Sequence, residues 1–142
     1  MSKRDIEFFV FDIYVAITKI EHTVSKFSDS QALLYSYTDW DSVIREFEII
    51  GEASKHLLKA ELLSTIHQPV VDFRNVIIHE YFGIDRDEVW EVIHEALPPF
   101  KEVIFALIDN IPCKLKQELI SATIEDNQYL DFVVKSLQTL ER

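Results

Sequence analysis

The segment RDIEFFVFDIYVAITKIEHTVSK (residues 4–26) carries the clearest structural signal in the chain. Its apolar residues recur at steps of three and four with charged residues between them, which predicts one long amphipathic helix. These positions are Ile6, Phe9, Val10, Ile13, Ile17, Ile20 and Val24. The 142 residues contain only two glycines and four prolines, which leaves little material for hairpins. We therefore expect an all-α protein.

The same periodicity predicts two helices in the middle of the chain. One begins at an N-cap on Thr38 and runs to about Leu63, after a short apolar turn at 31–37. Pro69 suits the first turn of the next helix, which we expect to stop at Gly83 in a left-handed cap.

Helical signals continue to the end of the chain. Asp85 is the expected cap of a further helix, which the pair at 98–99 (Pro-Pro) either kinks or restarts. Weaker amphipathic segments follow at 113–123 and 125–141. No repeat or low-complexity tract interrupts this order.

Composition limits the class of protein. Hydrophobic residues make up 48% of the chain and charged residues 27%, which excludes a disordered chain. The net charge of −11 argues against a broad electrostatic footprint on nucleic acid, so any RNA contact must be local or shared with another chain. No apolar run is long enough to span a membrane. The single Cys113 is expected to be a free, buried or half-buried thiol, and the cytoplasm is the expected location.

The stretch RNVIIHEYFG (74–83) holds an unusual trio, Arg74, His79 and Tyr81. Chance supplies about 0.5 Arg-to-His pairs at such spacings in a chain of this composition, but only about 0.006 triplets. A purely structural interpretation remains open: a surface arginine, a histidine stabilised at the helix end and a core tyrosine.

Helical geometry bears on whether the trio forms a site. Arg74 and Tyr81 fall within about 20° of one stripe, whereas His79 lies about 140° from Arg74. An Arg–His pair therefore needs either a folded arginine side chain or a second copy of the helix across a two-fold axis. Histidine transfers protons near neutral pH and arginine binds phosphate oxygens. Together, with Asn75 as a neutral donor, they suit attack of a ribose 2′-hydroxyl on the adjacent phosphodiester.

A metal site is the competing interpretation. Glu91 and His94 have the Glu-x-x-His spacing of di-iron bundles, and Glu48, Glu52 and His56 share one helix face. Bundle sites use two such motifs and the chain has one, so solvated helix faces explain these residues better. We expect neither a metal nor another cofactor.

Three ordered blocks carry a family resemblance: RNVIIHEYFGIDRDEVW (74–90), IREFEIIGEASKHL (44–57) and LPPFKEVI (97–104). They resemble the HepT-like branch of the HEPN proteins, toxins encoded beside a minimal nucleotidyltransferase of the MntA type. The resemblance covers roughly residues 5–108. It implies an up-and-down bundle of four or five helices over residues 1–110, with 111–142 as a C-terminal helical extension packed on the same domain.

The resemblance also implies an activity and partners. The implied protein is a homodimeric, metal-independent endoribonuclease with Arg74 and His79 as the catalytic pair and Asn75 in support. Tyr81 matches the tyrosine that the cognate nucleotidyltransferase antitoxin modifies with AMP. Two alternatives stay open: a non-catalytic nucleotide- or substrate-binding subunit of a minimal nucleotidyltransferase, which the acidic charge favours, and a generic bundle whose motif is only structural.

Overall fold

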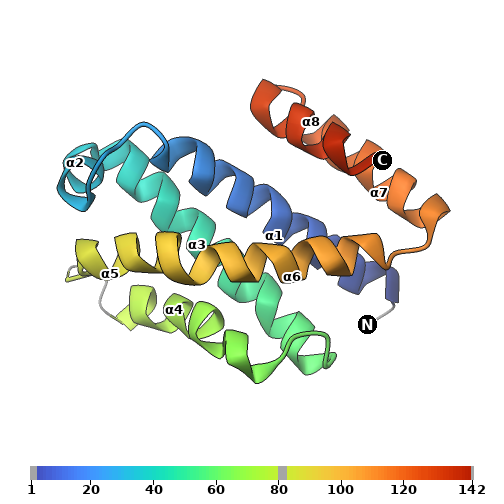
Figure 1. The fold of residues 1–142 in the computed structure, drawn as a ribbon, viewed down its shortest axis with the longest axis horizontal. Helices are drawn as coiled ribbons and strands as arrows, with labels where there is room; N and C mark the ends of the chain where they lie inside the picture. The colour runs from blue at the N-terminus through green and yellow to red at the C-terminus, as the bar shows by residue number, and fades with distance from the viewer. Residues whose placement is uncertain (1–2, 80–82, 142) are drawn as a thin grey trace.

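The computed structural model describes residues 3–79 and 83–141, and all regular structure among them is helical (Figure 1). In chain order the elements are α1 (Lys3–Val24), α2 (Ser30–Tyr35), α3 (Tyr37–Lys59), the 3-10 helix η1 (Thr65–His67), α4 (Gln68–His79), α5 (Arg86–Glu91), the π-helix η2 (Val92–Ala96), α6 (Leu97–Asp109), α7 (Cys113–Asp126), α8 (Asp131–Gln138) and the 3-10 helix η3 (Thr139–Glu141). The prediction of an all-α fold is confirmed.

The long helices run up and down around one apolar core (Figure 1). Helix α1 packs against α3 and α6, and α4 lies along α3. The largest fully buried side chains come from five helices: Phe11, Ile13, Ile17 and Ile20 of α1, Leu33 of α2, Phe47, Ile50 and Leu57 of α3, Ile77 of α4, and Leu97, Phe100 and Ile104 of α6. This is the expected up-and-down bundle. No helix among the described residues is long and apolar enough to cross a membrane.

Helices α5 and α6 form one rod joined by the π-helix (Figure 1). The cap at Asp85 is confirmed, because its carboxylate accepts a hydrogen bond from the Asp87 backbone N–H at 2.8 Å. Pro98 and Pro99 lie in the first turn of α6. Neither proline donates a backbone hydrogen bond, and the wide π turn before them removes the need for one. The helical rod therefore continues through the prolines, with a π-helical segment directly before them.

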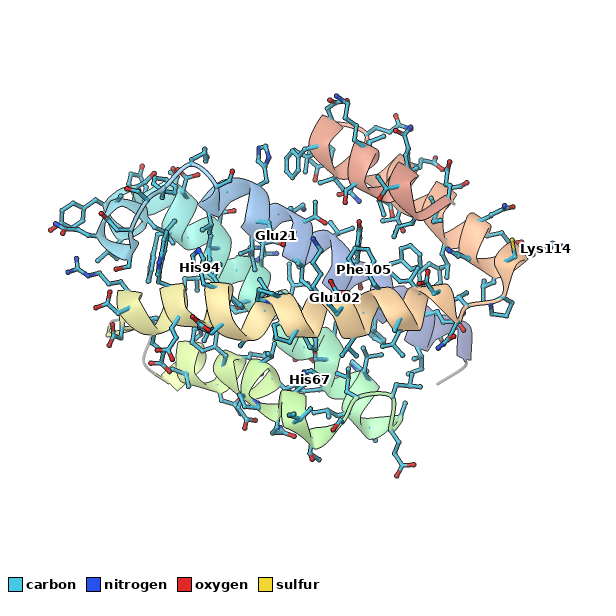
Figure 2. All side chains as sticks on the ribbon, in the orientation of Figure 1. Glu21, His67, His94, Glu102, Phe105 and Lys114 are labelled. Atoms are coloured by element: carbon cyan, nitrogen blue, oxygen red, sulfur yellow. The ribbon has the colours of Figure 1, made fainter. Side chains whose placement is uncertain are left out.

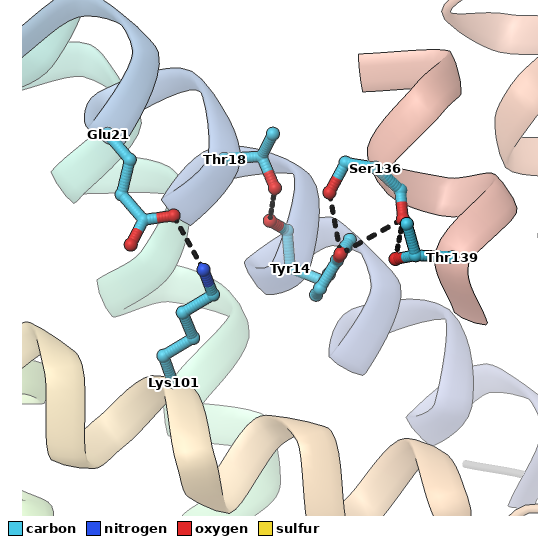
Figure 3. A network of polar contacts seen from close by, with 6 residues as sticks. All are labelled: Tyr14, Thr18, Glu21, Lys101, Ser136 and Thr139. Carbon is cyan, nitrogen blue, oxygen red and sulfur yellow. Dashed lines mark hydrogen bonds and ion pairs between the residues drawn. The ribbon is translucent and has the colours of Figure 1, made fainter. Parts of the chain in front are cut away.

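The C-terminal helices lie against α1 (Figure 3). The hydroxyls of Tyr14 and Ser136 are 2.6 Å apart. On the other side of α1, Lys101 of α6 pairs with Glu21 at 2.7 Å. Apolar side chains of α7, α8 and η3 also join the core, namely Leu119, Ile120, Val133, Leu137 and Leu140. The division of the chain into 1–110 and 111–142 stays a prediction.

The predicted limits of α3 are wrong at both ends. Ser36, not Thr38, is the N-cap residue, and its hydroxyl donates to the Asp39 carboxylate at 2.6 Å. The helix ends at Lys59, where Glu61 adopts a left-handed φ of 60° and reverses the chain. The apolar residues at 62–63 extend the sequence periodicity, but Leu63 reaches the core from the loop instead.

Three further predictions are corrected near the ends of helices. Gly83 has no positive φ, so it is not a left-handed cap. Cys113 is exposed rather than buried, because it opens α7 on the solvent side after Pro112. The last helix begins at Asp131 rather than near 125, because the Asn127 side chain donates to the Thr123 carbonyl and ends α7.

Acidic side chains line a groove of about 240 Å³ between α1, α3 and α7. Burial raises the pKa of Glu46, which is only 8% exposed, with Lys19 and Arg45 acting in the opposite direction. Desolvation and the nearby Asp126 raise the pKa of Asp12. The folded chain therefore holds these protons to a higher pH than the unfolded chain does.

This difference predicts a pH-dependent gain from Glu46→Gln. Because the pKa of Glu46 is raised in the folded state, wild-type stability falls as pH rises from the ordinary value of 4.5 through the folded pKa. Glu46→Gln should therefore raise the free energy of unfolding at pH 7, with a gain that shrinks toward acid pH. Urea unfolding across pH measures this, with the exposed Glu125→Gln as control. A gain independent of pH would contradict the assignment.

Candidate functional site

Helix α4 holds Arg74 against α3. The buried face of α4 carries Val70, Phe73 and Ile77, and the Phe73 ring meets Phe47 of α3 edge to face at a centroid distance of 5.1 Å. This packing fixes the rotation of α4 about its axis. Arg74 consequently faces α3 rather than open solvent.

Gly51 of α3 makes room for Arg74. A Cβ atom built on Gly51 would stand 2.4 Å from the Cβ of Arg74 and 3.1 Å from its Cδ. Real Cβ atoms essentially never come as close as 2.4 Å to another atom, and the Cβ of Arg74 moves only with the backbone of its helix. Only glycine at 51 allows the two helices to lie at this distance with arginine at 74.

The Arg74 guanidinium is paired but still accessible. Its Nη2 lies 3.3 Å from Oε2 of Glu52, and the two side chains are 27% and 54% exposed. An exposed pair of this kind contributes about 0–1 kcal/mol to stability. Because guanidinium has five N–H donors, donors remain for a second anion such as a phosphate.

The structure describes less of the other predicted site residues than of Arg74. Asn75 is exposed on α4 beside Arg74. His79 is the last residue of α4, but its side chain lies outside the described part of the structure, as does the whole of Tyr81. The structure thus fixes the arginine and the helix that carries the histidine. The facing of two Arg–His pairs across a two-fold axis stays a prediction.

A groove of about 300 Å³ lies along the same helix α3. Its lining includes Trp40, Arg45 and Glu48 of α3, together with Ile84, which lies three positions after Tyr81 in the sequence. Positions 45, 48 and 52 recur at steps of three and four, so they lie on one stripe of α3. The groove therefore adjoins the stripe that contacts Arg74, and it contains a second guanidinium.

Sequence reasoning missed Gly51 and Arg45 as site residues. One signal was present for Gly51, because a glycine in a helix interior costs about 1 kcal/mol relative to alanine and requires a packing reason. No signal was present for Arg45. It lines a groove together with Ile84 only because the fold brings α3 close to the residues that follow α4.

The metal interpretation finds no support in the contacts of its residues. Glu52 pairs with Arg74, and His56 stacks on the Phe9 ring at 4.1 Å. His94 lies on the π-helix (Figure 2), and its Nδ1–H donates to the Trp90 carbonyl at 2.8 Å. Within residues 3–79 and 83–141, no three His, Cys, Asp or Glu side chains could hold a metal ion together. The absence of a metal from the site stays a prediction.

Comparison with known proteins gives a consistent set of relatives. Residues 13–107 match the family described as HepT-like, Ribonuclease HepT-like. "Putative RNase MJ1380" of Methanocaldococcus jannaschii is 33% identical over 112 residues, covering 73% of this chain and 97% of the relative. "Probable ribonuclease HepT" of Thermococcus cleftensis is 32% identical over 104 residues, covering 70% and 92%. No solved structure matches the chain.

Proposed function

The chain belongs to the HepT-like ribonuclease family, and on this basis we propose that it is a metal-independent endoribonuclease acting as the toxin of a toxin–antitoxin pair. The observation that carries the proposal is the placement of Arg74. Its side chain is partly exposed, packs along Gly51 and pairs with Glu52, on the helix that ends at His79.

The proposed chemistry needs one acid/base and one permanent cation. His79 removes the proton from a ribose 2′-hydroxyl, whose oxygen attacks the adjacent phosphorus while the bond to the 5′-oxygen breaks. A histidine returns a proton to that leaving oxygen. Arg74 stabilises the charge that grows on the phosphoryl oxygens, with Asn75 as a further donor. The products are a 2′,3′-cyclic phosphate and a 5′-hydroxyl.

A homodimer completes this proposal. Arg74 and His79 are five positions apart along one helix, which sets them about 140° apart around its axis. Two α4 helices related by a two-fold axis give each arginine a histidine from the other chain. A shared site also suits a chain of net charge −11, because RNA then needs few phosphate contacts with either copy.

RNA cleavage by the purified protein tests the function directly. We expect single-stranded RNA to be cut in the presence of EDTA, with 2′,3′-cyclic phosphate ends on the 5′ fragments. An RNA with a 2′-deoxyribose at the cleaved position is the matched control and should stay intact there, because it lacks the nucleophile. Cleavage of the deoxy control would refute the mechanism, and no cleavage of either RNA would refute the activity.

We propose that the toxin is inhibited by modification of Tyr81. The cognate nucleotidyltransferase, of the MntA type, would transfer AMP from ATP to the tyrosine hydroxyl and release pyrophosphate. The added phosphate brings negative charge and bulk three positions before Ile84, a residue that lines the Arg45 groove. It would compete there with RNA phosphates for the site's guanidinium groups.

Mass spectrometry of the co-expressed pair checks this regulation. Wild-type chain produced with the adjacent nucleotidyltransferase should gain mass in AMP-sized steps, and Tyr81→Phe should gain none because it has no acceptor hydroxyl. Tyr129→Phe, at an exposed tyrosine far from Tyr81 in the sequence, serves as control and should be modified normally. An unmodified wild-type chain, or full modification of Tyr81→Phe, would contradict the assignment.

The acidic charge favours a second function, in which the chain is a non-catalytic partner subunit of the nucleotidyltransferase. Arg74 and His79 would then hold a nucleotide without cutting RNA. Tight nucleotide binding without RNA cleavage, in the assay above, would select this alternative.

A further inference from the structure

A separate cavity of about 370 Å³ lies at one end of the bundle. It is formed where the first turns of α1 meet the chain just after α3 and the end of α6 (Figure 1). Its walls are mostly apolar and include Val10, Leu62, Leu107 and Ile111. Cavities of roughly this size hold small organic ligands in many proteins. None of its lining residues belongs to the Arg74 site.

Glu7 brings a carboxylate to this mostly apolar wall, which also includes the amide of Asn110. It lines the cavity and is 6% exposed. Its Oε2 atom is out of contact with solvent and has no hydrogen-bond partner among the described residues. A buried carboxylate oxygen without a hydrogen bond is costly, so such an atom calls for a ligand or a functional reason. The outer torsion of a glutamate is broad, which lets the carboxylate turn toward an occupant.

We propose that this cavity binds a small primary amine in its protonated form, with the ammonium on Glu7 and the hydrocarbon chain against Val10, Leu62 and Leu107. An ammonium donates charge-assisted hydrogen bonds to the orphaned oxygen. The apolar wall removes the methylene groups from water. An anion is excluded by the same carboxylate, and a neutral apolar molecule leaves the carboxylate unpaired.

The residues near the cavity also limit the number of positive charges that the ligand can carry. A second cavity, lined by Ile6, His56, Lys59 and Ala60, shares Ile6 and Ala60 with the first. The Lys59 ammonium, which lines this second cavity, repels a second cationic group on the ligand. A monoamine therefore fits better than a diamine.

Calorimetric titration of the full-length protein at constant ionic strength tests the site. The probe is n-pentylammonium chloride, and n-pentanol is its neutral counterpart of nearly equal size. We expect saturable binding of pentylammonium at least about tenfold tighter than that of pentanol, a ratio that corresponds to about 1.4 kcal/mol. 1,5-Diaminopentane should bind more weakly than the monoamine. Equal affinities for amine and alcohol, or no saturable binding of the amine, would overturn the proposal.

Two variants separate the ammonium contact from a general apolar effect. Glu7→Gln keeps the side-chain shape and removes the charge, so pentylammonium binding should weaken at least about tenfold while pentanol binding stays unchanged. Leu107→Phe fills the apolar wall and should weaken both. Circular dichroism checks that each variant is folded. Unchanged amine binding by a folded Glu7→Gln would overturn the proposal, and the comparison of wild-type ligands does not depend on either variant.

Discussion

Replacing His79 by alanine is expected to lower the rate of RNA cleavage by about 10²–10⁴-fold, the usual contribution of a general acid or base. Arg74→Ala should lower it by a similar factor, because it removes the charge that stabilises the phosphoryl oxygens. Single-turnover cleavage of labelled RNA measures both losses. Expression without the proposed antitoxin gives a second measurement: we expect the wild type to arrest growth and both variants to relieve that arrest.

Controls for these two variants come from the same chain. His94→Ala removes an exposed histidine of the π-helix and should leave cleavage unchanged. Mixing the two inactive variants tests the dimer: if each site combines Arg74 of one chain with His79 of the other, the mixed dimer regains one complete site. Retained cleavage by both single variants would refute the catalytic assignment. No recovery on mixing would refute only the shared site.

Gly51→Ala is expected to lower RNA cleavage by about 10²-fold, although position 51 never touches RNA in the proposed mechanism. The new Cβ would stand 2.4 Å from the Cβ of Arg74, so α4 must move or the arginine must leave its place. A displacement of about 1 Å that takes a catalytic group out of its productive geometry lowers the reaction rate by about this factor. Overpacking at a core contact also costs about 1–3 kcal/mol, partly offset by the better helix propensity of alanine.

The second glycine provides the matched control for Gly51→Ala. Nothing lies within 4 Å of the position where a Cβ on Gly83 would stand, and its φ is not positive, so Gly83→Ala should be tolerated. Cleavage and thermal unfolding are measured for both variants at a temperature where both are folded. Wild-type activity in Gly51→Ala would show that the arginine does not need its present position.

Much of the fold follows from local sequence signals. The apolar spacing in 4–26 identifies α1, Asp85 marks the start of α5 and Pro69 lies in the first turn of α4. These signals succeed because they act within one or two helical turns. Helix ends were less predictable: the choice between Ser36 and Thr38 as N-cap depends on where α2 stops, which the local pattern does not contain.

The candidate site also has features that the sequence shows and contacts that only the structure shows. The motif of Arg74, His79 and Tyr81 is visible in the sequence because its residues lie within eight positions of one another. The contact of Gly51 with Arg74 is not visible, because 23 positions separate two residues that only the packing of α3 on α4 joins. Glu52 illustrates the difference, since its spacing suggested a metal ligand and its position makes it the counter-ion of Arg74.

By itself, then, the sequence determined the all-α class and most helices, and it predicted which residues carry the chemistry. Periodicity, capping and motif spacing are properties of neighbouring residues, so they can be read without a structure. Only the tertiary structure decided which glycine makes room for the arginine, which carboxylate pairs with it, and that Glu7 is left unpaired in an apolar cavity. Those features depend on the rotation and separation of whole helices, which the packing of the common core sets.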